Sequence, residues 1–145
     1  MKPEQLAALI GYRLEQGHET LREAEILLKE LALRGAINRT YYAMFYAVLA
    51  LLATKRIGTS KHSAIIAAFD REFVKTGVFA REFSRSLHIA FDRRQTHDYG
   101  EMIPIDRQTV EETLANAKAF VLQVEAYLRP SESSSLDAED SSAFR

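Results

Sequence analysis

The 145-residue chain contains no cysteine and only three prolines. The absence of cysteine excludes disulfides, thiolate zinc sites, iron–sulfur clusters and cysteine nucleophiles, and it is typical of a reducing compartment. The formal net charge of −1 gives no overall cationic field of the kind that favours nucleic-acid binding. The longest apolar run, Tyr41 to Ala53, is shorter than the roughly 20 residues that span a bilayer. We therefore expect a soluble, cytoplasmic protein with no secretory signal, membrane segment or cofactor.

Apolar residues recur with helical period through most of the chain, and no segment alternates with the period of a strand. Each proline stands where an element could begin or end. The pattern predicts an all-α fold, an antiparallel up-and-down bundle of about five helices that forms one domain over residues 1–128. We expect the helices at approximately residues 11–33, 36–55, 60–77, 80–94 and 106–128.

The expected helix boundaries rest on local signals. Gly35, after Arg34, is expected to end the first helix in a left-handed cap, and Gly77 to end the third. Thr59 or Ser60 is expected to cap the start of the third helix. The second helix has no charge between residues 41 and 53, which indicates the central helix of the bundle.

Charge is unevenly distributed along the chain. Residues 129–145 are rich in serine and acidic residues, and we expect them to form a disordered tail. Residues 55–94 contain nine basic and four acidic residues, so the middle of the chain is locally cationic although the whole is not. The sequence therefore predicts a basic region within the helical domain.

The densest polar cluster lies at residues 93–99. Helical spacing from Leu87 and Ala90 places Arg94 on the buried face of the fourth helix, where a charge requires a partner. Asp98 and Tyr99, just beyond the expected helix end, are the candidate partners. A buried ion pair with Asp98 that closes the bundle is the structural alternative to a functional site.

Histidine is the side chain whose charge changes near neutral pH, and His97 lies within this cluster. His97 could act as a general acid or base on a phosphodiester, with arginine stabilising the developing anion. The alternative is an exposed loop histidine. The four histidines show no metal-ligand spacing, so no metal site is predicted.

Two further groups lie earlier in the chain. Arg39, Tyr42 and Tyr46 stand near the start of the central helix, where tyrosines are more often core residues with a hydrogen-bonded hydroxyl. Lys61 and His62 lie in the first turn of the third helix, where backbone N–H groups favour an anion. An exposed helix start with a capping role explains the second group equally well.

Several of these residues together resemble the HEPN superfamily, and in particular its small stand-alone prokaryotic branch. The resemblance rests on RTYYAMFYA at residues 39–47, KHS at 61–63, FDREFVK at 69–75 and Arg94-x-x-x-Asp98-Tyr99. It implies an antiparallel helical bundle, usually a homodimer. It also implies a toxin-like protein that is paired with a minimal nucleotidyltransferase, many such proteins being metal-independent RNases.

The RNase signature of that family is an arginine followed, after about four to six residues, by a histidine, often with a tyrosine two residues later. Here three residues separate Arg93 from His97 and two separate Arg94 from His97, while Tyr99 follows His97 by two. The resemblance implies Arg94, His97 and Arg93 as candidate catalytic residues. Candidate nucleotide- or RNA-binding residues are Asp98, Tyr99, Arg39, Tyr42, Lys61 and His62.

Three functions remain open at this point. In the first, the chain is a toxin-like protein that cleaves or binds RNA. Arg94 and Arg93 hold phosphate, His97 is the acid–base group, and Tyr99 orients His97 or accepts AMP. In the second, the chain is a non-catalytic module that binds a nucleotide or a nucleotidyltransferase. In the third, it is a structural subunit whose apolar helix faces bury a partner.

Overall fold

A computed structural model of the protein describes residues 1–99 and 103–129. All regular elements within these residues are helical, which confirms the all-α prediction. They are α1 (Pro3–Lys29), α2 (Leu33–Thr54), α3 (His62–Phe69), the π-helix η1 (Asp70–Val74), α4 (Arg81–Tyr99) and α5 (Arg107–Leu128). Apart from Arg129, the expected tail (129–145) lies outside the described residues.

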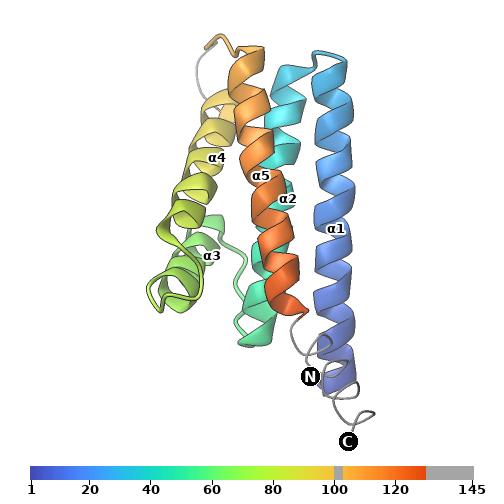
Figure 1. The fold of residues 1–145 in the computed structure, drawn as a ribbon, viewed down its shortest axis with the longest axis vertical. Helices are drawn as coiled ribbons and strands as arrows, with labels where there is room; N and C mark the ends of the chain where they lie inside the picture. Colours follow the sequence, from blue (N-terminus) through green and yellow to red (C-terminus); the bar gives the residue numbers. More distant parts are fainter. Residues whose placement is uncertain (100–102, 130–145) are drawn as a thin grey trace, which may run out of the picture.

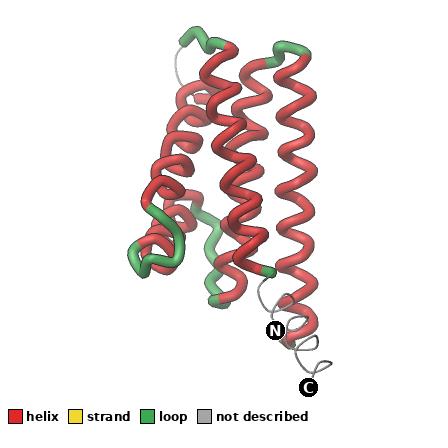
Figure 2. Tube along the Cα trace, viewed as in Figure 1, coloured by secondary structure: helices red, strands yellow, loops and turns green. Residues whose placement is uncertain are grey.

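The four long helices α1, α2, α4 and α5 run alternately up and down along the long axis of the molecule (Figure 1). The short α3 and η1 lie at one end, beside the start of α4. The described connections are short and stand near the ends of the helices (Figure 2). None of the described helices is long and apolar enough to cross a membrane.

The central position of α2 follows from its uncharged sequence. It contacts α1, α3, α4 and α5, and a helix that is apolar on all sides can be buried by several neighbours at once. Tyr41, Met44 and Leu51 are fully buried within it, together with Phe69 and Phe120 from other helices. The core is therefore built around α2, as its composition predicts.

The connection between α1 and α2 differs from the prediction. The first helix ends at Lys29 rather than near residue 33, and Leu31, not a glycine, takes the left-handed conformation with φ 59°. Gly35 lies inside α2, where an added Cβ would stand 3.2 Å from Leu27 Cδ1. Gly35 therefore permits close packing of α2 against α1, and its expected role as a helix cap was wrong.

The third helix also begins differently from the prediction. Lys61 is its N-cap residue, in place of the expected Thr59 or Ser60, and the Lys61 side chain forms no capping hydrogen bond with the described residues. The helical segment widens into the π-helix η1 before it ends, and Gly77 then takes φ 84° in the following turn. The left-handed glycine after this segment agrees with the prediction.

The C-terminal end of α4 lies further along the chain than predicted. The helix continues to Tyr99, whereas the sequence predicts an end near Arg94. Arg34 of α2 donates to the carbonyl oxygen of His97, and so satisfies one of the terminal carbonyls that otherwise have no helical partner. The next helix, α5, begins close to residue 106 as predicted, and the Asp106 carboxylate caps it by accepting from Thr109 N at 2.7 Å. This hydrogen bond lowers the pKa of Asp106.

Candidate functional site

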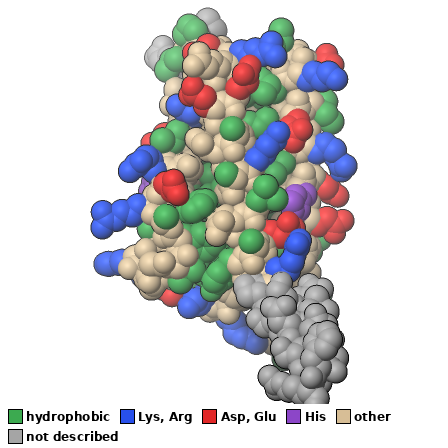
Figure 3. All heavy atoms as spheres, in the orientation of Figure 1, with side chains coloured by type: hydrophobic (Ala, Val, Ile, Leu, Met, Phe, Trp, Pro, Cys, Tyr) green, Lys and Arg blue, Asp and Glu red, His purple; other side chains and the backbone are tan. Residues whose placement is uncertain are grey.

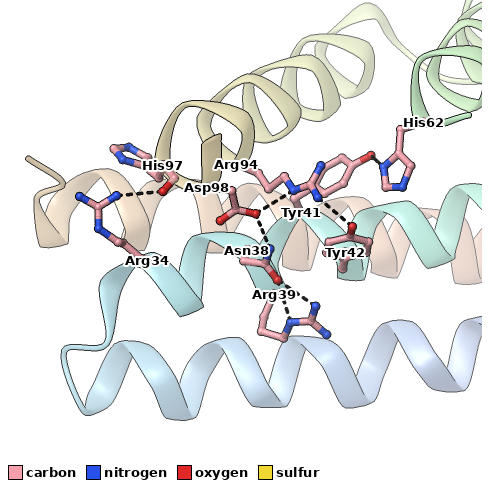
Figure 4. A network of polar contacts seen from close by, with 9 residues as sticks. All are labelled: Arg34, Asn38, Arg39, Tyr41, Tyr42, His62, Arg94, His97 and Asp98. Carbon is pink, nitrogen blue, oxygen red and sulfur yellow. Dashed lines mark hydrogen bonds and ion pairs between the residues drawn. The ribbon is translucent and has the colours of Figure 1, made fainter. Parts of the chain in front are cut away.

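Arg94 is buried between α4 and α2, with 8% of its surface exposed, as its helical spacing predicts. Its Nε donates to Asp98 Oδ2 at 3.0 Å, and an Nη atom donates to the Tyr42 hydroxyl at 3.0 Å (Figure 4). Asp98, one of the two candidate partners offered by the sequence, therefore pairs with Arg94. This pair is formed within α4, at i and i+4, rather than across the end of the helix. We call Arg94, Asp98, Tyr42, Asn38 and Arg39 the Arg94 cluster.

Asn38 of α2 joins the Arg94 cluster from the opposite side, and sequence reasoning missed it. Its Nδ2 donates to Asp98 Oδ2 at 2.7 Å, while its Oδ1 accepts from two nitrogens of Arg39 at 3.1 and 2.8 Å. Arg39 also lies 3.6 Å from a Glu23 carboxylate oxygen and 5.0 Å from the centre of the Tyr42 ring. An amide one turn before Tyr42 was the only sequence signal for this contact.

A second polar pair lies beside the Arg94 cluster, where α3 begins. The Tyr41 hydroxyl and His62 Nδ1 are 2.8 Å apart, and the His62 ring stacks on Phe45 with centroids 4.3 Å apart. Burial, with a smaller contribution from the Arg94 charge, lowers the pKa of His62, and burial raises the pKa of Tyr41. His62 thus faces the aromatic residues of α2, while Lys61 is exposed at the helix start.

Arg93 and His97 point away from the Arg94 cluster. Arg93 donates to the hydroxyl of Thr113 on α5, so the structure does not bring Arg93 and Arg94 together. The His97 ring is directed away from the Arg94–Asp98 pair (Figure 4). Burial first, and then the charge of Arg34, lowers the pKa of His97, and its Nδ1 is shielded from solvent without a hydrogen bond to any described residue.

Arg34 was also missed by the sequence analysis. Besides the carbonyl of His97, it contacts the carbonyl of Ile103 at 3.2 Å, and it thereby ties α2 to both sides of the α4–α5 connection. Tyr99 is the last residue of α4, and its side chain lies outside the described part of the chain. Tyr46 packs against Tyr42 with ring centroids 6.1 Å apart.

The chemistry available here is that of a guanidinium held in a fixed position. Two acceptors from different helices orient Arg94, and such preorganised donors stabilise developing negative charge well. The lowered pKa values of His62 and His97 leave both imidazoles neutral at pH 7, able to accept a proton. In the described part of the chain no three His, Asp or Glu side chains gather as metal ligands would.

The fold and site thus define a class: an antiparallel helical bundle with an arginine cluster buried between its central and fourth helices. A model of the HEPN domain matches residues 10–127, which include every candidate site residue. The chain belongs to the HEPN family, as its sequence motifs suggested.

Three relatives illustrate the similarity. A UPF0332 protein of Thermotoga maritima is 41% identical over 117 residues, or 81% of this chain and 89% of that protein. Putative toxin MJ0142 of Methanocaldococcus jannaschii is 35% identical over 115 residues, 79% of this chain and 78% of that protein. Putative toxin MJ0605 of the same organism is 31% identical over 126 residues, 87% of this chain and 90% of that protein.

Proposed function

We propose that the protein is the toxin-like member of a pair with a minimal nucleotidyltransferase, and that it acts in the cytoplasm on RNA. Membership of the HEPN family and the two relatives with toxin in their names support this function. The active form is a homodimer. The nucleotidyltransferase is the antitoxin-like partner, and Tyr99 is the residue that it modifies with AMP.

The observation that carries the proposal is the fixed position of Arg94. Asp98 and Tyr42 hold its guanidinium at the junction of two helices, so it is oriented before any ligand arrives. A phosphodiester oxyanion takes the place of the Asp98 carboxylate as an acceptor, because both are anionic oxygen groups suited to a guanidinium. Asn38 then retains the displaced Asp98, to which it already donates.

In the catalytic version of this function, His97 is the acid–base group. Its imidazole is neutral near pH 7, as a general base must be, and it lies one helical turn beyond Arg94. A change in the rotamer of His97 is required, because its ring is directed away from the Arg94–Asp98 pair.

A non-catalytic module that binds a nucleotide or the partner protein is the second candidate. The specific observation in favour of this module is that Arg93 donates to Thr113 and lies outside the Arg94 cluster. Of these two neighbouring arginines, Arg94 alone belongs to the Arg94 cluster. In this version, Arg94 holds a phosphate, and no side chain transfers a proton.

The test compares parent, His97→Ala and Arg94→Lys on labelled total RNA without added metal. Tyr46→Phe serves as a control, since no hydrogen bond of its hydroxyl is found among the described residues. Circular dichroism and light scattering establish that each variant is folded and in the parent's oligomeric state. Cleavage of RNA by the parent that is lost in both His97→Ala and Arg94→Lys supports the RNase function.

The other results separate the two candidates. RNA binding without cleavage, weakened by Arg94→Lys and unchanged by His97→Ala, favours the binding module. Cleavage that His97→Ala leaves intact removes His97 from the mechanism. A parent that neither binds nor cleaves RNA contradicts the proposed action on RNA.

A further inference from the structure

We propose that a second surface, the groove between η1 and α4, binds the phosphodiester backbone of single-stranded RNA. The inference rests on the proposed action on RNA and assigns it a binding surface outside the Arg94 cluster. The groove is a hollow of about 630 Å³ lined by Ala67, Asp70, Arg71, Val74, Lys75, Arg81 and Ser84. Arg81 precedes Arg94 by 13 residues in the same helix, which corresponds to about 20 Å along its axis.

Three of the seven described residues that line this groove are cationic, and Asp70 is the one acidic residue among those seven. The carboxylate of Asp70 is directed at α4, where Oδ2 lies 2.7 Å from His88 Nε2, and its Oδ1 is shielded from solvent. Arg71 forms an ion pair with Glu72, in which Nε lies 2.9 Å from Oε2, whereas Lys75 and Arg81 form no ion pair with a described residue. The described lining residues therefore carry a net positive charge.

The local backbone explains why these cations gather. The π-turn is closed by a hydrogen bond of 2.8 Å from Lys75 N to Asp70 O, and π-turns are frequent at functional sites. Phe79 is buried, and its N–H donates to Phe73 O at 2.8 Å, so the chain folds back before α4 begins. This return places Arg81 across the groove from Arg71 and Lys75.

The charge and its spread indicate the ligand. Lys and Arg side chains project from the edge of the molecule where α3 and α4 lie (Figure 3). Several exposed cations around an open hollow suit a chain of phosphates better than one small anion, because each phosphate meets its own counter-charge. None of the described residues that line the groove is aromatic, so we expect contacts to the backbone without base preference.

Salt dependence tests this assignment. The probe is a fluorescein-labelled single-stranded RNA oligonucleotide, and its dissociation constant is measured by anisotropy at 50 and 200 mM salt. For single strands each neutralised phosphate adds about 0.7 to the slope of log affinity against log salt. We expect the double variant Lys75→Gln/Arg81→Gln to make this slope shallower by about 1.4. Between 50 and 200 mM salt the variant should therefore lose about sevenfold less affinity than the parent.

The control is Arg22→Gln/Lys29→Gln, which removes the same charge from exposed positions on α1. A slope that falls in the groove variant and not in this control supports the proposal. Equal falls in both variants show diffuse charge attraction and overturn it. All variants are checked for folding by circular dichroism.

The remaining outcomes separate this inference from the proposed function. If parent and groove variant bind RNA alike while Arg94→Lys binds more weakly, the groove assignment fails and the Arg94 cluster keeps its role. If the parent binds phosphatidylglycerol vesicles but not RNA, the RNA assignment is overturned together with the proposed action on RNA. Binding of neither probe overturns both.

Discussion

The guanidinium of Arg94 donates to the hydroxyl of Tyr42 over 3.0 Å, and this contact joins residues that are 52 positions apart. It links the fourth helix to the central helix at the point where Asp98 also accepts from Arg94. One buried arginine thus serves the packing of the bundle and the candidate site. Variants can separate the two roles, because stability and RNA action are measured independently.

Tyr42→Phe tests the contribution of this hydroxyl. The variant keeps the ring and removes one acceptor of Arg94, so we expect the free energy of unfolding to fall by about 1 kcal/mol. Tyr46→Phe is the matched control one turn later in α2, with an expected change near zero. Urea unfolding followed by circular dichroism measures both variants, and equal effects would show that the Arg94 contact contributes nothing specific.

Asn38→Ala tests the part of the Arg94 cluster that the sequence did not predict. In a double-mutant cycle with Asp98→Ala we expect a coupling energy of about 1 kcal/mol, since Asn38 donates to a partly exposed carboxylate. A cycle of Asn38→Ala with His97→Ala serves as the control and should couple by less than about 0.5 kcal/mol. A coupling to Asp98 no larger than that control would contradict the hydrogen bond.

The lowered pKa values of His62 and His97 predict how stability depends on pH. Below the ordinary value of 6.5 the unfolded chain takes up protons that the folded chain resists, so the free energy of unfolding falls as the solution becomes more acidic. The stabilisation is complete above pH 6.5 and is lost as pH falls through the lowered folded-state pKa values.

Urea unfolding between pH 5 and pH 7 measures this dependence. We expect His62→Gln to flatten the curve, because glutamine cannot take up the proton. The double variant with His97→Gln should flatten it further. A single His62→Gln variant that keeps the parent's slope would show that His62 does not produce the effect.

Glycine replacements in α1 test the close contact between α1 and α2. An added Cβ at Gly17 would lie 3.3 Å from the carbonyl oxygen of Ala43, whereas at Gly11 it would meet no atom of the described residues within 4 Å. Gly11→Ala should therefore stabilise the protein by about 0.5 to 1 kcal/mol through helix propensity. Gly17→Ala should lose that gain to the clash and destabilise the protein. Thermal unfolding measures the stability of both variants. Equal stabilisation by the two replacements would contradict the close packing of α1 against α2 at Gly17.

The helix boundaries show which helix ends local sequence signals predict correctly and which they do not. The start of α5 near residue 106 was predicted correctly, and the structure adds that the Asp106 carboxylate caps it by accepting from the backbone N–H three residues later. The end of α4 was predicted five residues too early, because Arg34 comes from another helix to satisfy its last turn. Gly35 was misread as a cap for a similar reason, since its role is to leave room for Leu27.

The sequence by itself determined the helical class, the central place of α2 and the burial of Arg94, and it offered Asp98 and Tyr99 as candidate partners. The class and the burial follow from the periodicity of the apolar residues along each helix. Only the tertiary structure decided that Asn38 and Tyr42 complete the Arg94 cluster, that Arg93 turns to α5, and that the η1–α4 groove gathers its cations. Those contacts depend on how far each helix slides and rotates against its neighbours, and that register is set by the packing of the whole core.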